Sequence, residues 1–223
     1  MLRKNWKIML RTMGLLLVGE GALMLVCSAI GFFYSDEGAL PFLFSALFTM
    51  AVGALSLMGS PLKKEDIDKR MAYLVVTSVW VVMSLFGTLP FFATGTISNF
   101  TDAFFESMSG FTTTGASILD NIESQPHALL LWRSLTQWLG GLGIVFFTVA
   151  ILPIFGIDKV QLFAAEATGV AQRKVHSRVA VGSRWIFGIY ILLTTACAIS
   201  LKACGMGWFD AINHALTTIA TSG

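Results

Sequence analysis

In the segment FTTTGAS at positions 111–117, a phenylalanine is followed by hydroxyl-bearing and small residues. The segment is set among long apolar runs. The lipid core holds no water to satisfy exposed backbone groups, so non-helical chain persists there only inside protein or along an aqueous path. Successive backbone carbonyls of such a segment can replace the hydration shell of an ion. Gly115 fits this chemistry because glycine reaches positive φ at little cost. Hard, neutral oxygens of this kind suit an alkali cation rather than a soft transition metal.

A short helix is expected directly before this segment, with Thr101 or Asp102 as its N-cap and Gly110 as its end. An extended Thr/Gly strand would follow the helix. A short helix and a strand between two apolar runs predict a re-entrant pore loop. The alternative is a buried turn that merely joins two spanning helices.

The last residues of the chain repeat this pattern. WFDAINHALTTIATSG at 208–223 aligns with FTDAFFESMSGFTTTG at 100–115, so that Asp210 falls under Asp102 and Gly223 under Gly115. Repeats with interrupted hydrophobic segments at membrane depth indicate a substrate path where the repeats meet. The second copy therefore favours a pore loop over a chance turn.

The composition places these segments in a membrane protein. Hydrophobic residues make up 55% of the chain and charged residues 13%, whereas about 25% of the residues of a soluble domain are charged. The net charge of +2 gives no reason to expect a nucleic-acid partner. The expected fold class is an all-α polytopic membrane protein in contact with membrane lipid.

Five apolar runs are long enough to span a bilayer. They are about Met9–Phe33, Leu40–Met58, Met71–Ala93, Leu129–Phe155 and Val179–Cys204. We expect a two-helix N-terminal segment at 1–62 and a first helix–pore loop–helix repeat at 63–156. A cytoplasmic linker at 157–178 and a second, incomplete repeat at 179–223 would follow.

The charges predict how the chain crosses the membrane. Basic residues precede the first span and fill the second and fourth connections, whereas acidic residues fill the first and third. By the positive-inside rule the N-terminus is cytoplasmic and the acidic connections face outward. Each short helix then enters from outside and directs its C-terminal end, with its partial negative charge, into the membrane.

These residues resemble the Trk/Ktr/HKT superfamily of potassium transporters, and most closely its bacterial Trk branch. The resemblance is carried by FFESMSGFTTTGAS at 104–117, WRSLTQWLGGLGI at 132–144 and QLFAAE at 161–166. It implies four helix–pore loop–helix units around one potassium path in the bacterial plasma membrane, preceded by two extra spans. It also implies a homodimer and a cytosolic nucleotide-binding regulatory subunit.

The resemblance assigns the filter residue by residue. The potassium-binding positions are Thr112, Thr113, Thr114 and Gly115 in the first repeat and Ala220, Thr221, Ser222 and Gly223 in the second. A filter with four sides needs four such contributions, so we expect the sequence to be a fragment of a longer transporter. Potassium would be the transported substrate, and no organic cofactor is expected.

A charged residue near the outer end of the fourth span calls for a partner. Arg133 could pair with Glu106 or Asp102 and so support the first pore helix, because ionisable residues within the membrane are costly when unpaired. The alternative is an arginine whose side chain extends to the outer interface.

Two further features are open at this point. Gly140, Gly141 and Gly143 indicate either close helix packing or a hinge beneath the filter. Glu20 lies within the first span with no partner evident from the sequence.

Potassium uptake is the function that these observations favour, and an enzyme is not expected. One alternative is a non-conducting membrane assembly subunit. The other is an intramembrane hydrolase with Ser117 as nucleophile, which lacks an obvious histidine base within reach.

Overall fold

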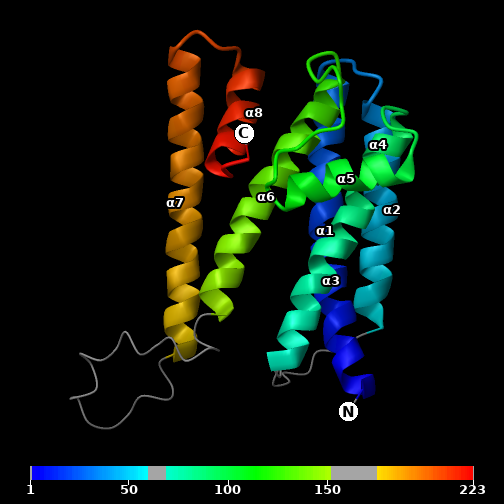
Figure 1. Ribbon diagram of the computed structural model, residues 1–223, viewed down its shortest axis with the longest axis vertical. Helices are drawn as coiled ribbons and strands as arrows, with labels where there is room; N and C mark the ends of the chain where they lie inside the picture. Colours follow the sequence, from blue (N-terminus) through cyan, green and yellow to red (C-terminus); the bar gives the residue numbers. More distant parts are fainter. Residues whose placement is uncertain (1, 60–68, 152–174, 223) are drawn as a thin grey trace, which may run out of the picture.

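The computed structural model describes residues 2–59, 69–151 and 175–222, and every element in these ranges is a helix. The helices are α1 (Leu2–Phe33), α2 (Ala39–Met58), α3 (Lys69–Gly87), α4 (Leu89–Ala93), α5 (Phe100–Phe111), α6 (His127–Ile151), α7 (Val175–Ala203) and α8 (Trp208–Ile219). The long helices run side by side, while the short α5 lies across them and α8 turns back beside α7 (Figure 1). The all-α fold class with two re-entrant short helices is confirmed.

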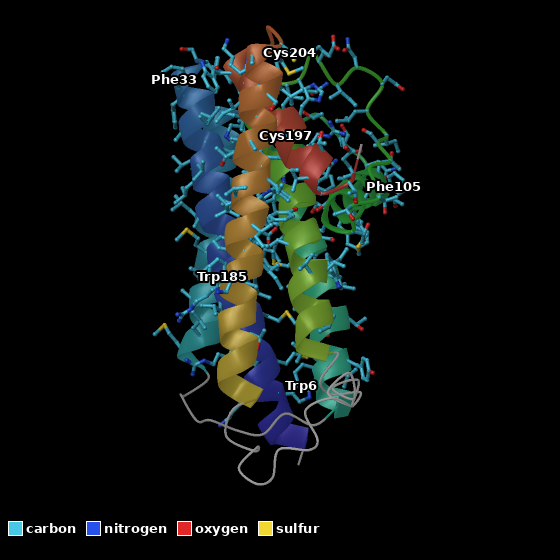
Figure 2. The ribbon with its side chains drawn as sticks, turned by 90° about the vertical axis from the view of Figure 1, so that its left-hand side faces the viewer. Trp6, Phe33, Phe105, Trp185, Cys197 and Cys204 are labelled. Atoms are coloured by element: carbon cyan, nitrogen blue, oxygen red, sulfur yellow. The ribbon has the colours of Figure 1, made fainter. Side chains whose placement is uncertain are left out.

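Four described helical segments are long and apolar enough to cross a membrane: Met9–Phe33, Ala39–Met58, Tyr73–Ala93 and Arg184–Ala203. Large apolar side chains such as Phe33 and Trp185 project outward from them (Figure 2). Because exposed apolar surface of this extent is unfavourable in water, it marks the lipid-facing side of the bundle. The protein is therefore a membrane protein. The expected linker at 157–178 and the first domain boundary at 62–63 lie largely or wholly outside the described residues.

Helices α1 and α2 form a close antiparallel pair because glycines face each other where they cross. A Cβ atom at Gly14 would lie 2.7 Å from the Gly53 carbonyl oxygen, and one at Gly53 would lie 2.8 Å from the Gly14 carbonyl oxygen. Without side chains there, the two backbones approach directly, as small residues allow in membrane bundles.

The third expected span, Met71–Ala93, is confirmed as a segment of membrane-spanning length at Tyr73–Ala93, but it is not one unbroken helix. It divides into α3 and α4 at Thr88, because Pro90 has no backbone N–H to continue the α3 ladder. The Thr88 hydroxyl donates to the Leu85 carbonyl oxygen at 2.6 Å, which satisfies one acceptor at the break.

The limits of the first pore helix also differ from expectation. Neither Thr101 nor Asp102 is its N-cap: the Asn99 side chain accepts a hydrogen bond from the Thr101 N–H at 3.0 Å, so the helix begins at Phe100. It ends at Phe111 rather than at Gly110, and a turn follows in place of the expected extended strand.

The core lies where α1, α2, α5 and α6 meet. Trp132 is fully buried, and its ring contacts Phe42 and Phe111 edge-on. Its indole N–H donates to the Gly87 carbonyl oxygen at 3.2 Å, at the C-terminal end of α3. A single tryptophan thus connects the α3 end to the end of the first pore helix, which fixes the depth of α5 in the bundle.

The Glu20 carboxyl group lies in this interior. Glu20 is 1% exposed, and neither of its carboxylate oxygens has a hydrogen-bond partner among the described residues; the same holds for the Ser107 Oγ. Both side chains lie against Gly87, where a Cβ atom would stand 3.3 Å from Glu20 Oε1.

We expect Glu20→Met to raise the unfolding temperature in detergent, because it removes an unsatisfied polar group that costs about 1–3 kcal/mol and keeps a similar volume. Thermal unfolding followed by size-exclusion chromatography measures this. A lower unfolding temperature for Glu20→Met, with Glu20→Gln unchanged, would instead show that a polar group at position 20 makes a stabilising hydrogen bond inside the protein.

Candidate functional site

The first pore helix ends in a tight reversal of the chain. The Thr113 N–H donates to the Gly110 carbonyl at 2.9 Å, and the Thr114 N–H donates to the Ser109 carbonyl at 2.9 Å. This pair of bonds is a Schellman C-cap, whose left-handed residue is usually glycine. Here that residue is Thr113, with φ of +55°. The chain then turns again at Gly115, whose φ is +75°, as predicted.

The second pore helix ends in the same way. The Thr221 N–H donates to the Thr218 carbonyl at 3.0 Å, and the Ser222 N–H donates to the Thr217 carbonyl at 3.1 Å. Thr221, which aligns with Thr113, also has a φ of +55°. The internal repeat therefore extends to individual hydrogen bonds and dihedral angles. Gly223 lies outside the described residues.

A left-handed threonine in each loop is the feature that sequence reasoning missed. A β-branched residue at positive φ is an outlier and persists only where its surroundings hold it. The signal was present, because the tetrads TTTG at 112–115 and ATSG at 220–223 share only two residues, the glycine and the threonine at position 113 or 221.

The two loops touch each other at their tips. A Cβ atom at Gly115 would overlap the carbonyl oxygen of Ser222, and it would lie 3.3 Å from the Ser222 hydroxyl. Residues 107 positions apart thus form adjoining parts of one surface. The glycine is required both by its backbone angle and by this close approach.

Hydroxyl groups within the first loop hold its shape. The Thr112 Oγ1 donates to the Met108 carbonyl at 2.8 Å, and the Thr112 and Thr114 hydroxyls are hydrogen-bonded to each other at 2.8 Å. The Ser109 hydroxyl donates to the Ala116 carbonyl at 2.6 Å. These bonds satisfy the polar groups of a non-helical segment without water, as the interior of a membrane protein demands.

The Glu106 carboxylate of α5 holds α6 and the chain after the first loop by hydrogen bonds. It accepts hydrogen bonds from the Ile118 N–H at 2.9 Å, the Ser117 hydroxyl at 3.0 Å and the Arg133 Nε at 2.7 Å. The Glu106 side chain is 3% exposed and the Arg133 side chain 14%. Of the two partners offered by the sequence, the structure joins Arg133 to Glu106. Asp102 lies in the first turn of α5, where a carboxylate favours the positive end of the helix dipole.

The contacts of Ser117 and Ile118 with Glu106 were not expected from the sequence. They connect the chain just beyond the Gly115 turn to the middle of α5, so the pore helix holds the segment that follows its own loop. Because the Ser117 hydroxyl donates to a carboxylate that already pairs with Arg133, the geometry gives no support to Ser117 as a nucleophile.

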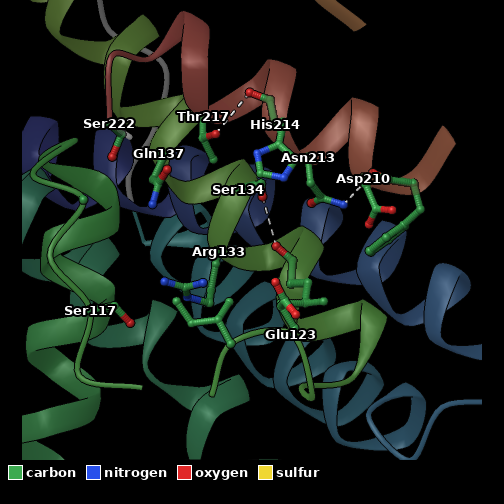
Figure 3. A pocket seen from close by; sticks show the side chains of 14 residues that line it. Ser117, Glu123, Arg133, Ser134, Gln137, Asp210, Asn213, His214, Thr217 and Ser222 are labelled. Carbon is green, nitrogen blue, oxygen red and sulfur yellow. Dashed lines mark hydrogen bonds between the residues drawn. The ribbon is translucent and has the colours of Figure 1, made fainter. Parts of the chain in front are cut away.

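A cleft of about 660 Å³ opens beside the two loop tips, between α6, α8 and the chain after α5 (Figure 3). Glu123 and Asp210 line it, as do Gly115 and Ser222. Its wall includes three buried acceptors that have no donor among the described residues: Gln137 Oε1, Asn213 Oδ1 and Ser222 Oγ. Arg133 and His214 also line the cleft, but the Arg133 guanidinium is paired with Glu106. The carboxylates and unpaired oxygens therefore favour cations over anions.

An aromatic cluster fixes the start of the second pore helix. The His127 ring at the start of α6 is stacked on Tyr34, with ring centroids 4.0 Å apart, and meets Phe209 of α8 edge-on at 4.8 Å. The His127 Nδ1 lies 3.2 Å from Asp36 Oδ1 in the α1–α2 turn. The N-terminal helix pair and both repeats thus meet at one imidazole.

A family model described as "TrkH: Cation transport protein" matches residues 41–223. The chain belongs to this family. The potassium uptake protein TrkH of Escherichia coli K12 is 38% identical over 221 residues, which are 98% of this chain and 46% of that protein. TrkI of Halomonas elongata is 31% identical over 99% of this chain and 44% of that protein.

The crystal structure of the potassium transporter TrkH from Vibrio parahaemolyticus matches with a TM-score of 0.84 at 34% identity, over 98% of this chain and 44% of that one. The resemblance drawn from the motifs is therefore confirmed at the level of family and fold. The chain spans less than half the length of these relatives. Which atoms of the two loops hold an ion stays a prediction.

Proposed function

We propose that this chain forms part of a potassium uptake path across the bacterial plasma membrane. The observation that carries the proposal is the pair of pore loops with identical hydrogen-bonded turns, which meet at Gly115 and Ser222 beside an oxygen-lined cleft. Relatives named as potassium uptake proteins support potassium as the substrate.

The filter in this proposal comprises Thr112–Gly115 and Ala220–Gly223. Its cation preference has two physical sources. Both short helices direct their C-terminal ends, which carry partial negative charge, toward the loops. The backbone carbonyls after each left-handed threonine then replace water around the ion. Glu106, Arg133 and Asp102 act as structural support, since they position the loop or its helix rather than contact the ion.

The topology follows the charge pattern. The N-terminus is cytoplasmic, and the α1–α2 and α7–α8 turns both lie at the opposite end of the bundle, which is then the outer end (Figure 1). Residues 1–62 form the two-helix N-terminal segment, 63–156 the first repeat and 179–223 the part of the second repeat present here. In this proposal the complete transporter is a homodimer with a cytosolic nucleotide-binding regulatory subunit as its partner. The words "Trk system" in the names of its relatives support the presence of a further subunit.

The test is uptake of radioactive rubidium by proteoliposomes that contain the complete gene product. Unlabelled potassium should compete at a concentration at least ~10-fold lower than sodium, which corresponds to about 1.4 kcal/mol of discrimination. Empty liposomes are the control. Rubidium uptake that neither cation suppresses, or that both suppress equally, would contradict the proposal; no uptake from a correctly folded protein would favour an assembly subunit.

A further inference from the structure

Helix α6 passes between the two pore loops and contacts the end of each pore helix. It contains the sequence GGLG at 140–143. From the sequence alone, these glycines could serve either close helix packing or a hinge. The structure distinguishes its three glycines by what lies opposite each one.

Gly140 faces the first loop. A Cβ atom there would overlap the carbonyl oxygen of Phe111, the last residue of α5, and would lie 3.2 Å from the Phe111 Cα. The atoms opposite are backbone, which cannot move aside without displacing the loop. Gly110 shows the same closeness from the other side, since a Cβ there would overlap the Thr136 hydroxyl.

Gly141 faces the second loop. A Cβ atom there would lie 3.2 Å from the Cα and 3.3 Å from the Cβ of Ala220, the C-cap of α8. It would also lie 2.7 Å from the Tyr190 hydroxyl, which donates to the Trp138 carbonyl at 3.0 Å. Gly143, in contrast, has only the Trp80 ring at 3.7 Å, an ordinary contact distance.

We propose that Gly140 and Gly141 are positioning residues for ion selectivity, each of which seats one of two neighbouring filter loops against the same helix. Phe111 and Ala220 occupy nearly equivalent places in the two repeats, one residue apart in the alignment. Adjacent residues of α6 therefore set how deep the two filter loops lie relative to each other in the bundle. The inference rests on the proposed function, because only a filter converts this depth into selectivity.

A methyl group added at position 140 or 141 would displace a filter loop, because both contacts are close-packed. Added methyl groups in a close-packed interior are accommodated by backbone shifts. Here the displaced backbone lies directly before Thr112 in one loop and at Ala220 in the other. A carbonyl filter discriminates by the positions of its oxygens around the ion, so such a shift reduces discrimination while the helices remain folded.

The test compares Gly140→Ala, Gly141→Ala and Gly143→Ala in the complete gene product. The measured quantity is the ratio of the potassium and sodium concentrations that suppress rubidium uptake in proteoliposomes, with the amount of folded protein taken from size-exclusion chromatography. Gly143→Ala should keep the wild-type ratio. Gly141→Ala should lower it by roughly threefold to tenfold, and Gly140→Ala by at least ~10-fold.

Tyr190→Phe separates the Ala220 contact from the Tyr190 contact. It removes the hydroxyl that a side chain at position 141 would meet, but it leaves Ala220 in place. The ratio of the double variant Gly141→Ala/Tyr190→Phe should stay as low as that of Gly141→Ala; recovery to the Tyr190→Phe value would overturn the role of the Ala220 contact.

Folded Gly140→Ala or Gly141→Ala protein with the wild-type ratio would overturn the inference. If Gly140→Ala does not fold, the comparison of Gly141→Ala with Gly143→Ala still decides. If wild type and Gly143→Ala themselves lack selective uptake, the proposed function fails, which is a separate result.

Discussion

Replacing Gly115 by alanine should abolish selective rubidium uptake, with a loss of at least ~100-fold, because two separate penalties fall on one methyl group. The first is conformational, since Gly115 has a φ of +75°, and a left-handed conformation costs a non-glycine residue about 1–2 kcal/mol. The second is steric, because the new Cβ would overlap the Ser222 carbonyl oxygen. Relief of that overlap must separate the two loop tips. The measurement is rubidium uptake by proteoliposomes that contain equal amounts of folded protein.

Gly95→Ala is the matched control. Gly95 has a φ of +71°, almost the same as Gly115, but nothing lies within 4 Å of its hypothetical Cβ. This variant should show only the conformational penalty, as a modest decrease in unfolding temperature with selectivity unchanged. Equal loss of uptake in the two variants would mean that backbone strain, and not the contact between the loops, accounts for the effect at Gly115.

The requirement for glycine at position 115 could be predicted from the sequence, but the shape of the loop could not. Gly115 stood out because only glycine reaches positive φ cheaply. The chemistry of threonine gives no such indication at position 113. The φ of +55° is imposed by two Schellman bonds, from the Thr113 N–H to the Gly110 carbonyl and from the Thr114 N–H to the Ser109 carbonyl. Local propensity predicts an extended threonine, and the helix end overrides it.

The helices around the site were also predictable from the sequence in outline, but their caps and contacts were not. The long apolar runs predicted most ends of the long helices to within a few residues. Asn99 as N-cap was missed because Thr101 and Asp102 are equally good capping residues two and three positions later. The meeting of Gly115 with Ser222 required the bundle geometry, which no pattern in either loop contains.

Arg133→Leu should lower the stability of the folded protein by about 3–5 kcal/mol and impair uptake. The reason is that the substitution leaves the Glu106 carboxylate, 3% exposed, as an uncompensated charge in the interior. An arginine that only extended to the interface would be replaced at little cost, but here the side chain is 14% exposed and its Nε lies 2.7 Å from Glu106 Oε1. Thermal unfolding in detergent and rubidium uptake measure the two effects.

Lys202→Leu provides the matched control, because Lys202 is a basic residue in the last turn of α7 that is not part of a buried ion pair with Glu106. Its Nζ lies 5.5 Å from the Trp208 ring centroid in a partly exposed position, where a cation–π contact contributes about 0.5–1 kcal/mol.

The double variant Glu106→Gln/Arg133→Leu should recover part of the stability lost in Arg133→Leu. The neutral amide removes the buried charge, yet its oxygen still accepts from the Ile118 N–H. Additive losses in the double variant would show that the ion pair contributes nothing beyond the packing of its two side chains, and the support of the first filter loop would then rest on Ser117 and Ile118 alone.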